Sequence, residues 1–404
     1  MRTLLRGGHI VNARCELEQR DIAIAGGRIR FDTSGCDEVI DASGMVITPS
    51  FVNSHAHLGE TIFSGIAPVT SLKDYLEFTT RASTFINTDD LHTLISMHTI
   101  IQHLRTGITL FNAARGFEAV RRIGVRGCLG YPLMDSAKLH SFYQKFMKED
   151  IELEREQSPN GTDRIIPGLW VHSLRAVEEA AMDRVAAYAD LPFSIHVSET
   201  EEGARDFLLR NGITEIAYLR DKGLLNNRAN LVHCNHVSAK DVRLIRDSGA
   251  HVSVCPLSNL ILGTGFPDLP SMMGSGISAS MATDGLATNP YPNLFDTLAF
   301  ARTLWDVDAR ALFRMITTTP AQICGFDSVG VIDEGWYADL NFYSYDAGKG
   351  FDALFAAFLG GLTPEHVMAD GTFLVKDGSL SGHLEVIERK YYKLRRMFEG
   401  WVSA

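Results

Sequence analysis

The sequence predicts an α/β fold, a (β/α)8 TIM barrel combined with a small β-domain that both ends of the chain build together. Between residues 50 and 325, apolar strand-like runs alternate with longer helical stretches, as repeated strand–helix units do. On both flanks, 1–49 and 326–404, short strand patterns with glycine turns replace that alternation. Spacing alone leaves an open parallel sheet as the alternative to the barrel. The length of 404 residues and the hydrophobic share of 45% suit one large barrel with additions.

The terminal regions predict one small β-domain. Three N-terminal segments, 3–11, 21–32 and 38–51, combine β-branched or aliphatic residues with glycine turns. Strand patterns return at 329–346 and 366–380, and residues 388–402 predict a basic amphipathic helix. We expect the two terminal pieces to form one domain, with the barrel inserted between them.

The barrel region shows a helix pattern at 90–107 followed by a strand pattern at 108–113. Further strands are expected at 164–172, 193–197, 230–236, 251–258 and 278–284, and most of them precede a segment of helical character. A barrel of this kind places its catalytic groups at the C-terminal ends of the strands. Polar residues at those ends are therefore the candidates for function.

Composition argues against several classes of function. The formal net charge of -11 argues against a nucleic-acid partner. No run of about eighteen apolar residues occurs, and Arg, Gly and Glu interrupt the N-terminal residues, so we expect neither a membrane span nor a signal peptide. The six cysteines are scattered without a CxxC pair, which predicts neither a disulfide scaffold nor a thiolate zinc cluster. These features predict a cytoplasmic protein.

Four polar motifs follow the strand patterns. His55 and His57 come directly after an apolar run, and residues i and i+2 of an extended segment point the same way, so both imidazoles can bind one metal ion. His196 lies near the end of strand 193–197, and Glu199 follows three residues later. Each motif alone has an ordinary alternative, namely incidental loop histidines or a common strand-end histidine.

The other two motifs complete the pattern. His233 directly continues an apolar strand, whereas His236 is equally a loop residue or a hydrogen-bonded core histidine. Asp284 ends a strand of small residues, where a helix N-cap or a turn aspartate is an even alternative. The order HxH, HxxE, strand-end His and TDG at successive strand ends is hard to obtain by chance.

With these motifs the chain resembles the amidohydrolase superfamily, within the branch of cytosine, guanine, adenosine-type and aminodeoxyfutalosine deaminases and triazine hydrolases. The resemblance covers nearly the whole chain and includes HAH at 55–57, HVSET at 196–200, HCNHVS at 233–238, CPLSN at 255–259 and TDGLATNP at 283–290. It implies a distorted (β/α)8 barrel carrying a β-sandwich built from both termini. It also implies site residues, which are the metal ligands His55, His57, His196 and Asp284, a proton-transferring Glu199 and a polarising His233.

One divalent metal ion is expected. Dinuclear members of the superfamily bridge two metals with a carboxylated lysine, but no lysine occurs between Lys148 and Lys222. Zinc suits three histidines and a carboxylate, and Fe2+ or Mn2+ would also be held. Such an ion lowers the pKa of its water toward about 7, so metal-bound hydroxide attacks the substrate. Asp284 would take the water proton, Glu199 would protonate a ring nitrogen, and His233 would hydrogen-bond the developing oxygen.

Candidate substrate contacts lie beside these motifs. Glu60, close behind the HAH pair, is either a substrate contact or a solvated loop carboxylate. His172 matches a histidine of many relatives and is expected to face the substrate. Arg175 either binds an anionic group or pairs with a nearby glutamate, and Asn259 either caps the following segment or touches the ligand.

The predicted function is metal-dependent hydrolytic deamination of a purine-like, pterin-like or nucleoside-like heterocycle, with release of ammonia. Methylthioadenosine and S-adenosylhomocysteine deaminases have a Trp-Leu pair and a Pro-x-Glu element that contact ribose. At the same place this chain has Tyr75-Leu76 and then Glu77-Phe78-Thr79, which argues against ribose recognition of that kind. The alternatives are a triazine-type chlorohydrolase or amine hydrolase, an iminohydrolase or imidazolone-type hydrolase and, more remotely, a non-catalytic binding relative. The expected partners are a small heterocyclic substrate and water and, by analogy with relatives, a second copy of the chain in a homodimer.

Overall fold

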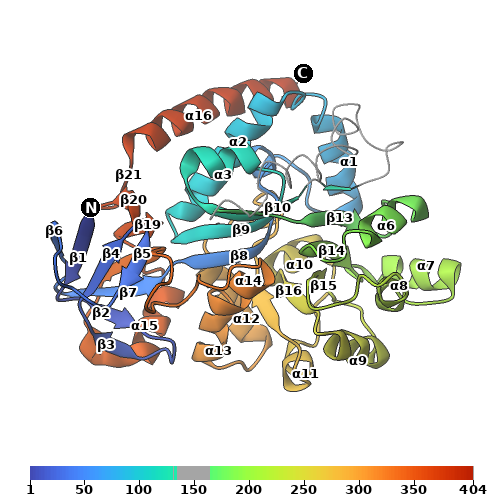
Figure 1. The fold of residues 1–404 in the computed structure, drawn as a ribbon. Coiled ribbons are helices and arrows are strands. Elements are labelled where there is room, and N and C mark those ends of the chain that lie inside the picture. The colour runs from blue at the N-terminus through green and yellow to red at the C-terminus, as the bar shows by residue number, and fades with distance from the viewer. Residues whose placement is uncertain (131, 134–163, 404) are drawn as a thin grey trace.

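Two parallel β-sheets form the centre of the molecule (Figure 1), and the computed structural model describes residues 1–130, 132–133 and 164–403. Their strand orders are β12-β10-β9-β8 and β11-β13-β14-β15-β16-β17. The strands are β8 Phe51–Ala56, β9 Ile108–Ala114, β10 Arg126–Gly130, β11 Pro132–Leu133, β12 Ile165–Pro167, β13 Leu169–Ser173, β14 Phe193–Val197, β15 Ala229–His233, β16 His251–Val254 and β17 Ala279–Met281. The strands predicted from the sequence in this region are present, although the one at 164–172 is divided at Gly168.

The two parallel sheets meet at two places. Gly168 alone separates β12 from β13, so one stretch of chain passes from the first sheet into the second. On the other side, Ala56 at the end of β8 forms a parallel bridge with Asp284, which follows β17. The Asp284 N–H also donates to the His55 carbonyl at 3.1 Å. These junctions bring the C-terminal ends of β8 and β17 together.

Hydrogen-bonded polar side chains connect strands of both sheets. Asn230 Nδ2 on β15 donates to the Ser54 carbonyl on β8 at 3.0 Å, and Ser253 Oγ on β16 donates to Asn230 Oδ1 at 2.7 Å. Asn112 Nδ2 on β9 donates to Ser194 Oγ on β14 at 3.0 Å. The aliphatic residues between these polar positions pack with helix residues in the main hydrophobic cluster. Alternation along each strand therefore separates a polar face from an apolar face.

Helices surround the parallel sheets (Figure 1). They are α2 Asp89–Leu104, α3 Phe117–Ile123, α6 Glu179–Ala186, α7 Glu201–Asn211, α8 Glu215–Asp221, α9 Ala239–Ser248, α10 Pro256–Leu262, α11 Leu269–Gly274, α12 Leu294–Leu304, α13 Ala309–Arg314 and α14 Thr318–Ile323. Several begin at a Thr or Ser whose side chain accepts a backbone N–H of the first turn, as Thr88, Thr200, Thr214 and Ser238 do. The expected helix at 90–107 is α2, which ends three residues earlier.

Strands from both ends of the chain lie in one seven-stranded sheet, of order β21-β20-β19-β18-β7-β2-β3, beside a four-stranded sheet β5-β4-β1-β6. The strands are β1 Arg2–Arg6, β2 His9–Val11, β3 Leu17–Gln19, β4 Ile22–Ala25, β5 Arg28–Arg30, β6 Glu38–Asp41, β7 Met45–Pro49, β18 Leu340–Ser344, β19 His366–Ala369, β20 Thr372–Lys376 and β21 Ser379–Leu380. Ile22 and Ile24 of the smaller sheet pack in one apolar cluster with Leu340 and Phe342 of the larger. Ser50 alone separates β7 in this region from β8 in the parallel sheet.

The C-terminal helix holds the segment that covers one end of the parallel sheets. Helix α16, Gly382–Ser403, runs along α2 at the top of Figure 1. Its Phe398 packs against Phe63 of the 3-10 turn η1, Thr61–Phe63, and against Phe78 of α1, Leu72–Ala82. Arg395 also donates to the Ser64 carbonyl at 2.8 Å. Two further elements, η3 Ala347–Lys349 and α15 Gly350–Leu359, lie between β18 and β19, where the sequence predicted no element.

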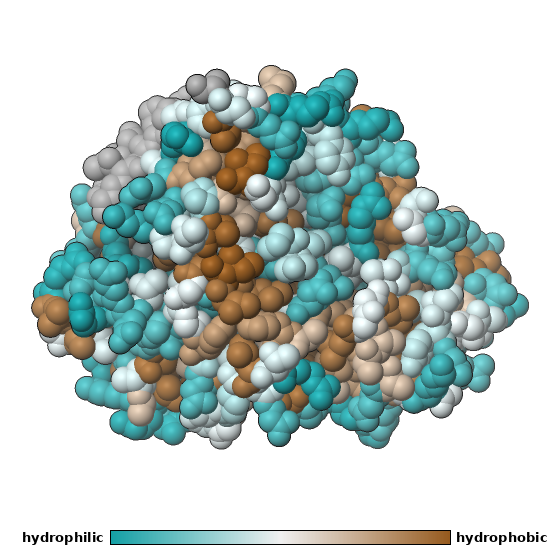
Figure 2. Space-filling view, turned by 180° about the vertical axis from the view of Figure 1, so that it is seen from behind, coloured by the Kyte–Doolittle hydropathy of each residue, from teal (hydrophilic) through white to brown (hydrophobic). Residues whose placement is uncertain are grey.

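The surface is mostly hydrophilic when seen from behind, and apolar side chains gather near the middle of that face (Figure 2). Within the described parts of the chain, no helix is both long and apolar enough to cross a membrane.

Candidate metal centre and active site

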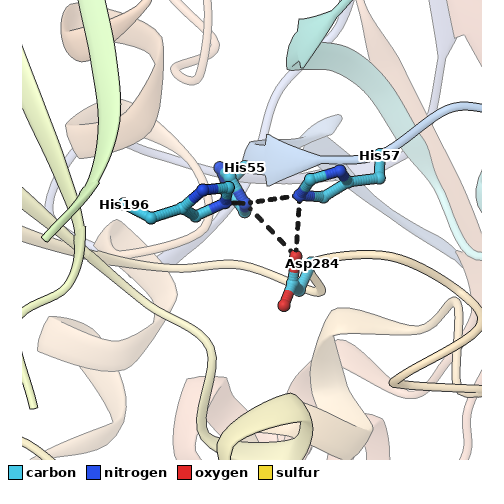
Figure 3. A group of neighbouring side chains, drawn as sticks. All are labelled: His55, His57, His196 and Asp284. Atoms are coloured by element: carbon cyan, nitrogen blue, oxygen red, sulfur yellow. Dashed lines mark hydrogen bonds and ion pairs between the residues drawn. The ribbon is translucent and has the colours of Figure 1, made fainter. Parts of the chain in front are cut away.

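Three histidines and one aspartate converge at the C-terminal ends of the parallel strands (Figure 3). His55 Nε2 lies 3.2 Å from His57 Nε2 and 3.0 Å from His196 Nε2. Asp284 Oδ1 lies 3.2 Å from His55 Nε2 and 3.1 Å from His57 Nε2. The structure therefore brings together all four residues that the sequence predicted as metal ligands.

The donor atoms of this cluster lie close enough to share one metal ion, since all four fall within 4.8 Å of one another. Zn–N bonds of about 2.0–2.1 Å in tetrahedral geometry separate neighbouring ligand atoms by about 3.3 Å, close to the four spacings of 3.0–3.2 Å given above. His57 Nδ1 lies 3.1 Å from Glu60 Oε1, and His196 Nδ1 lies 2.6 Å from the His172 carbonyl oxygen. Because both partners are acceptors, the Nδ1 atoms carry protons, and in the neutral rings the Nε2 atoms present lone pairs to one another and to the Asp284 carboxylate. A cation held between them would offset the repulsion of these lone pairs.

Each ligand has its own structural support. The ring of His55 stacks on the indole of Trp170, with centroids 4.9 Å apart and an interplanar angle of 15°. Trp170 is itself fixed, because its Nε1–H donates to a side-chain amide on β9 at 2.9 Å. Ser258, in the first turn of α10, donates its hydroxyl to Asp284 Oδ2 at 2.6 Å. That bond leaves Oδ1 directed at the histidines.

Left-handed backbone positions turn several site residues toward the cluster. Non-glycine residues with positive φ include Ser198 at 48°, directly after β14, His233 at 72°, at the end of β15, and Asp284 at 64°, three residues after β17. Such conformations cost roughly 1–3 kcal/mol each and persist only where the surroundings enforce them. Glu215, buried in α8, accepts the Ser198 N–H at 2.6 Å, which holds the turn that leads into Glu199.

His233 is held by a chain of buried amides. Its Nδ1 lies 2.8 Å from Asn259 Oδ1, and Asn259 Nδ2 donates to Asn235 Oδ1 at 2.9 Å. Asn235 Nδ2 in turn donates to the Glu199 carbonyl at 3.0 Å. Because Asn259 Oδ1 only accepts, the His233 proton lies on Nδ1, and Nε2 is the ring nitrogen left for the cavity.

Glu199 is buried beside the cluster, with Oε1 3.8 Å from His233 Nε2. Burial raises the pKa of the Glu199 carboxyl above its ordinary value, although the nearby His233 opposes that effect. The position predicted for the proton-transferring residue therefore holds a carboxyl group that keeps its proton to higher pH than an exposed glutamate.

The four predicted substrate contacts lie in different surroundings. Glu60 and His172 line the cavity next to the cluster, and burial lowers the pKa of His172 to about 4, so its ring is neutral at neutral pH. Arg175 is exposed and its guanidinium lies against Gly203 of α7, outside the cavity lining. Asn259 is fully buried and bonds His233 instead of facing the cavity. The structure thus brings two of the four to the cavity.

The cavity over the cluster is small, at about 40 Å³. Its apolar side is formed by Leu72, Tyr75 and Leu76 of α1 together with Leu262. A volume of this size holds a water molecule, whereas ligand pockets occupy about 300–1,000 Å³. Entry of a heterocycle therefore requires some of these lining side chains to move.

Several supporting residues were not found from the sequence. They are Ser258, Trp170, Asn235 and Glu215. Their partners lie 17 to 115 residues away in the chain, so no local pattern marks them. The one available signal was the SN pair at 258–259, in the first turn of the segment that follows the strand at 251–254, where a parallel sheet places the start of a helix against the site.

The parallel strands place three histidines and one aspartate at one end of their sheets. This arrangement defines the class of metal-dependent hydrolases. Within that class the chain belongs to the amidohydrolase family, because the model of that family matches residues 46–374. The resemblance expected from the motifs is therefore confirmed, and so is the expectation of a hydrolase acting on C–N bonds other than peptide bonds.

Curated relatives and solved structures agree with this placement. The chain is 30% identical to a 5-methylthioadenosine/S-adenosylhomocysteine deaminase of Halobacterium salinarum over 86% of this chain and 85% of the relative. In fold it is similar to a zinc-bound adenosine deaminase of Xanthomonas campestris, with a TM-score of 0.87, 21% identity and 98% of each chain covered. It is also similar to a zinc-bound atrazine chlorohydrolase of Arthrobacter aurescens, with a TM-score of 0.86, 20% identity and 97% and 100% of the two chains covered.

Proposed function

We propose that this protein is a metal-dependent hydrolytic deaminase that replaces the exocyclic amine of a nitrogen heterocycle by water, with purine nucleosides as the first substrates to test. The observation that carries the proposal is the convergence of His55, His57, His196 and Asp284 beside the buried Glu199. The deaminase named among the curated relatives supports the same reaction class and a nucleoside-like substrate.

The three histidines and Asp284 would hold the ion, and we propose zinc because three imidazoles and one carboxylate suit it. When bound, such an ion lowers the pKa of water toward about 7 and so supplies a nucleophile at neutral pH. Ser258 holds Asp284 Oδ2, so that Oδ1 faces the histidines, and the Asp284 carboxylate would take a proton from the attacking water.

Glu199 would act as the general acid. Its buried carboxyl has a raised pKa, so the neutral acid is available to protonate a ring nitrogen as the nucleophile adds. His233, with its Nδ1 proton given to Asn259, presents Nε2 to the same space 3.8 Å from Glu199. Nε2 is therefore the His233 atom that can exchange a proton with the oxygen on the attacked carbon.

We further propose that the ten parallel strands form one distorted barrel and that the two antiparallel regions form one sandwich, with domain limits at 1–49, 50–325 and 326–404. Three observations support this proposal. The chain passes from one parallel sheet to the other through Gly168, Ala56 forms a bridge with Asp284, and both antiparallel sheets share the apolar cluster around Phe342. The cytoplasmic location and the homodimer stay predictions from the sequence.

The direct test is ammonia release from a panel of heterocyclic amines by the zinc-loaded protein. The panel holds adenosine, 5'-deoxyadenosine, 5-methylthioadenosine, guanine and an aminopterin-type ring, together with a chlorotriazine that would release chloride. We expect ammonia from at least one aminopurine nucleoside, and no turnover by Asp284→Asn under the same conditions. Chloride release without ammonia would support the chlorohydrolase instead, and a zinc-loaded protein that turns over no compound would support a binding protein.

A further inference from the structure

Glu60 is bound on both of its carboxylate oxygens by the protein itself. Oε1 lies 3.1 Å from His57 Nδ1, three residues earlier in the chain. Oε2 accepts the phenol O–H of Tyr75, from helix α1, at 2.5 Å. The sequence predicted a substrate contact here, whereas the geometry occupies both oxygens before any substrate arrives.

We infer that Glu60 is a positioning residue that orients His57 for the metal ion, an inference that rests on the metal site of the proposed function. A neutral imidazole can bind a metal through Nε2 only when its proton lies on Nδ1. A carboxylate that accepts that N–H fixes the tautomer and the ring plane and makes Nε2 a stronger donor. Tyr75 holds the carboxylate in place from the opposite side.

A glycine at position 285 makes room for this arrangement. Gly285 directly follows the predicted ligand Asp284, and a Cβ atom at 285 would overlap Glu60 Oε2. The nearest other atom to that Cβ, beyond the Glu60 carboxylate, would be His57 Cβ at 3.4 Å, which is an ordinary contact. His57, Tyr75 and Gly285 come from three separate parts of the chain and all lie against the Glu60 carboxylate. A Cβ atom added at position 285 would overlap only Glu60.

This geometry predicts a specific pattern of zinc affinities, measured by chelator competition on the full chain with zinc alone as the probe. We expect Glu60→Ala to weaken zinc binding about 10–100-fold and Glu60→Gln to weaken it less, because the amide oxygen still accepts the Nδ1 proton. Gly285→Ala should weaken zinc binding by a similar factor. The double variant, with both Glu60→Ala and Gly285→Ala, should bind zinc no more weakly than Glu60→Ala alone. Glu77→Gln, which changes an exposed carboxylate of α1, is the matched control and should leave zinc affinity unchanged.

Substrate kinetics of the zinc-saturated variants separate positioning from substrate contact. A positioning role predicts that excess zinc restores much of the lost kcat in Glu60→Gln while KM stays near the wild-type value. A substrate contact predicts a raised KM that zinc does not correct. The inference is overturned if Glu60→Ala binds zinc like the wild type, if the two substitutions add, or if KM alone changes.

Two further measurements keep the result interpretable. If Glu60→Ala does not fold, Tyr75→Phe is the alternative, because it removes only the hydrogen bond from the Tyr75 phenol to Glu60 Oε2. Tyr75→Phe should weaken zinc binding by a smaller factor. The inference is overturned if Tyr75→Phe and Glu60→Gln both fold and both bind zinc with unchanged affinity. If the wild-type chain binds no zinc, the proposed metal site is refuted. If the wild-type chain binds zinc and Glu60→Ala binds it equally well, only the positioning role of Glu60 is refuted.

Discussion

Arg126 allows the clearest quantitative prediction because it is a buried charge between the two parts of the fold. Its guanidinium, on β10 of the parallel sheets, bonds Asp339 directly before β18 at 2.6 and 3.3 Å. It also bonds Asp370 at 3.2 Å and lies 3.6 Å from the ring centre of Tyr337. The side chains of Arg126 and Asp339 are each 1% exposed. Substitution of Arg126 by Met keeps the length of the side chain and removes the charge.

The expected loss follows from the charge that the substitution leaves behind. Asp339 would remain buried without its cation, and removal of one partner from a buried pair costs about 3–5 kcal/mol. An unfolding entropy of about 2.1 cal/mol/K per residue gives roughly 0.85 kcal/mol/K for 404 residues, so Tm should fall by roughly 4–6 °C.

Thermal and urea unfolding of Arg126→Met check this estimate against Arg122→Met. Arg122 pairs with Glu118 on the surface, with the two side chains 55% and 48% exposed, so its loss should cost less than about 1 kcal/mol. Adding Asp339→Asn to Arg126→Met should recover part of the stability, because the uncompensated charge disappears. Equal effects of the two arginine substitutions, or a further loss in the double variant, would refute the reasoning.

Four further predictions concern the site. Glu199→Gln should retain the metal and lose kcat by about 10²–10⁴-fold, and unaltered turnover would exclude the acid role. Burial raises the pKa of Glu199, and the proposed mechanism requires its acid form. The value of kcat/KM should therefore persist above the pH at which an ordinary glutamate ionises and then fall as the pH rises through the pKa of Glu199. A pH–rate profile without this alkaline fall would contradict the prediction. Asn259→Leu should lower kcat at least about tenfold with metal content unchanged, and Asn259→Asp, which still accepts the His233 proton, should lose less. His55→Ala should lack stoichiometric metal by elemental analysis, whereas chelator-treated wild type should regain activity with added zinc.

The secondary structure near the site was predictable because its patterns are local. The strand at 193–197 matches β14 in full, and alternation along it separates Ser194 and His196 from Phe193, Ile195 and Val197. Helix α15 was missed although its buried residues Phe351, Leu354, Phe355 and Phe358 follow helical spacing. This helix lies between the strand patterns at 329–346 and 366–380, in a segment for which no element was predicted.

The four proposed metal ligands could be predicted from the motifs and the family resemblance that these motifs carry, but their supports could not. Asn259 illustrates the limit, because its sequence position suggests a cap or a ligand contact equally well. Only the three-dimensional path of the chain brings its amide to His233, 26 residues earlier. Glu60 shows the same limit at shorter range, since spacing places it near His57 without revealing that Tyr75 occupies its second oxygen.

Strand alternation alone would place His233 on the wrong side of its sheet. In the register of β14 with β15, His196 pairs with Val232, and Val232 packs in a small cluster with Cys255 and Ala282 away from the helices. The next residue, His233, would by alternation face the helices as Leu231 does. Positive φ at His233 and Cys234 reverses that direction, and the Cys234 N–H secures the turn by donating to the Val197 carbonyl at 3.0 Å. Local strain at the strand end, which residue spacing does not encode, therefore decides that this histidine reaches the site.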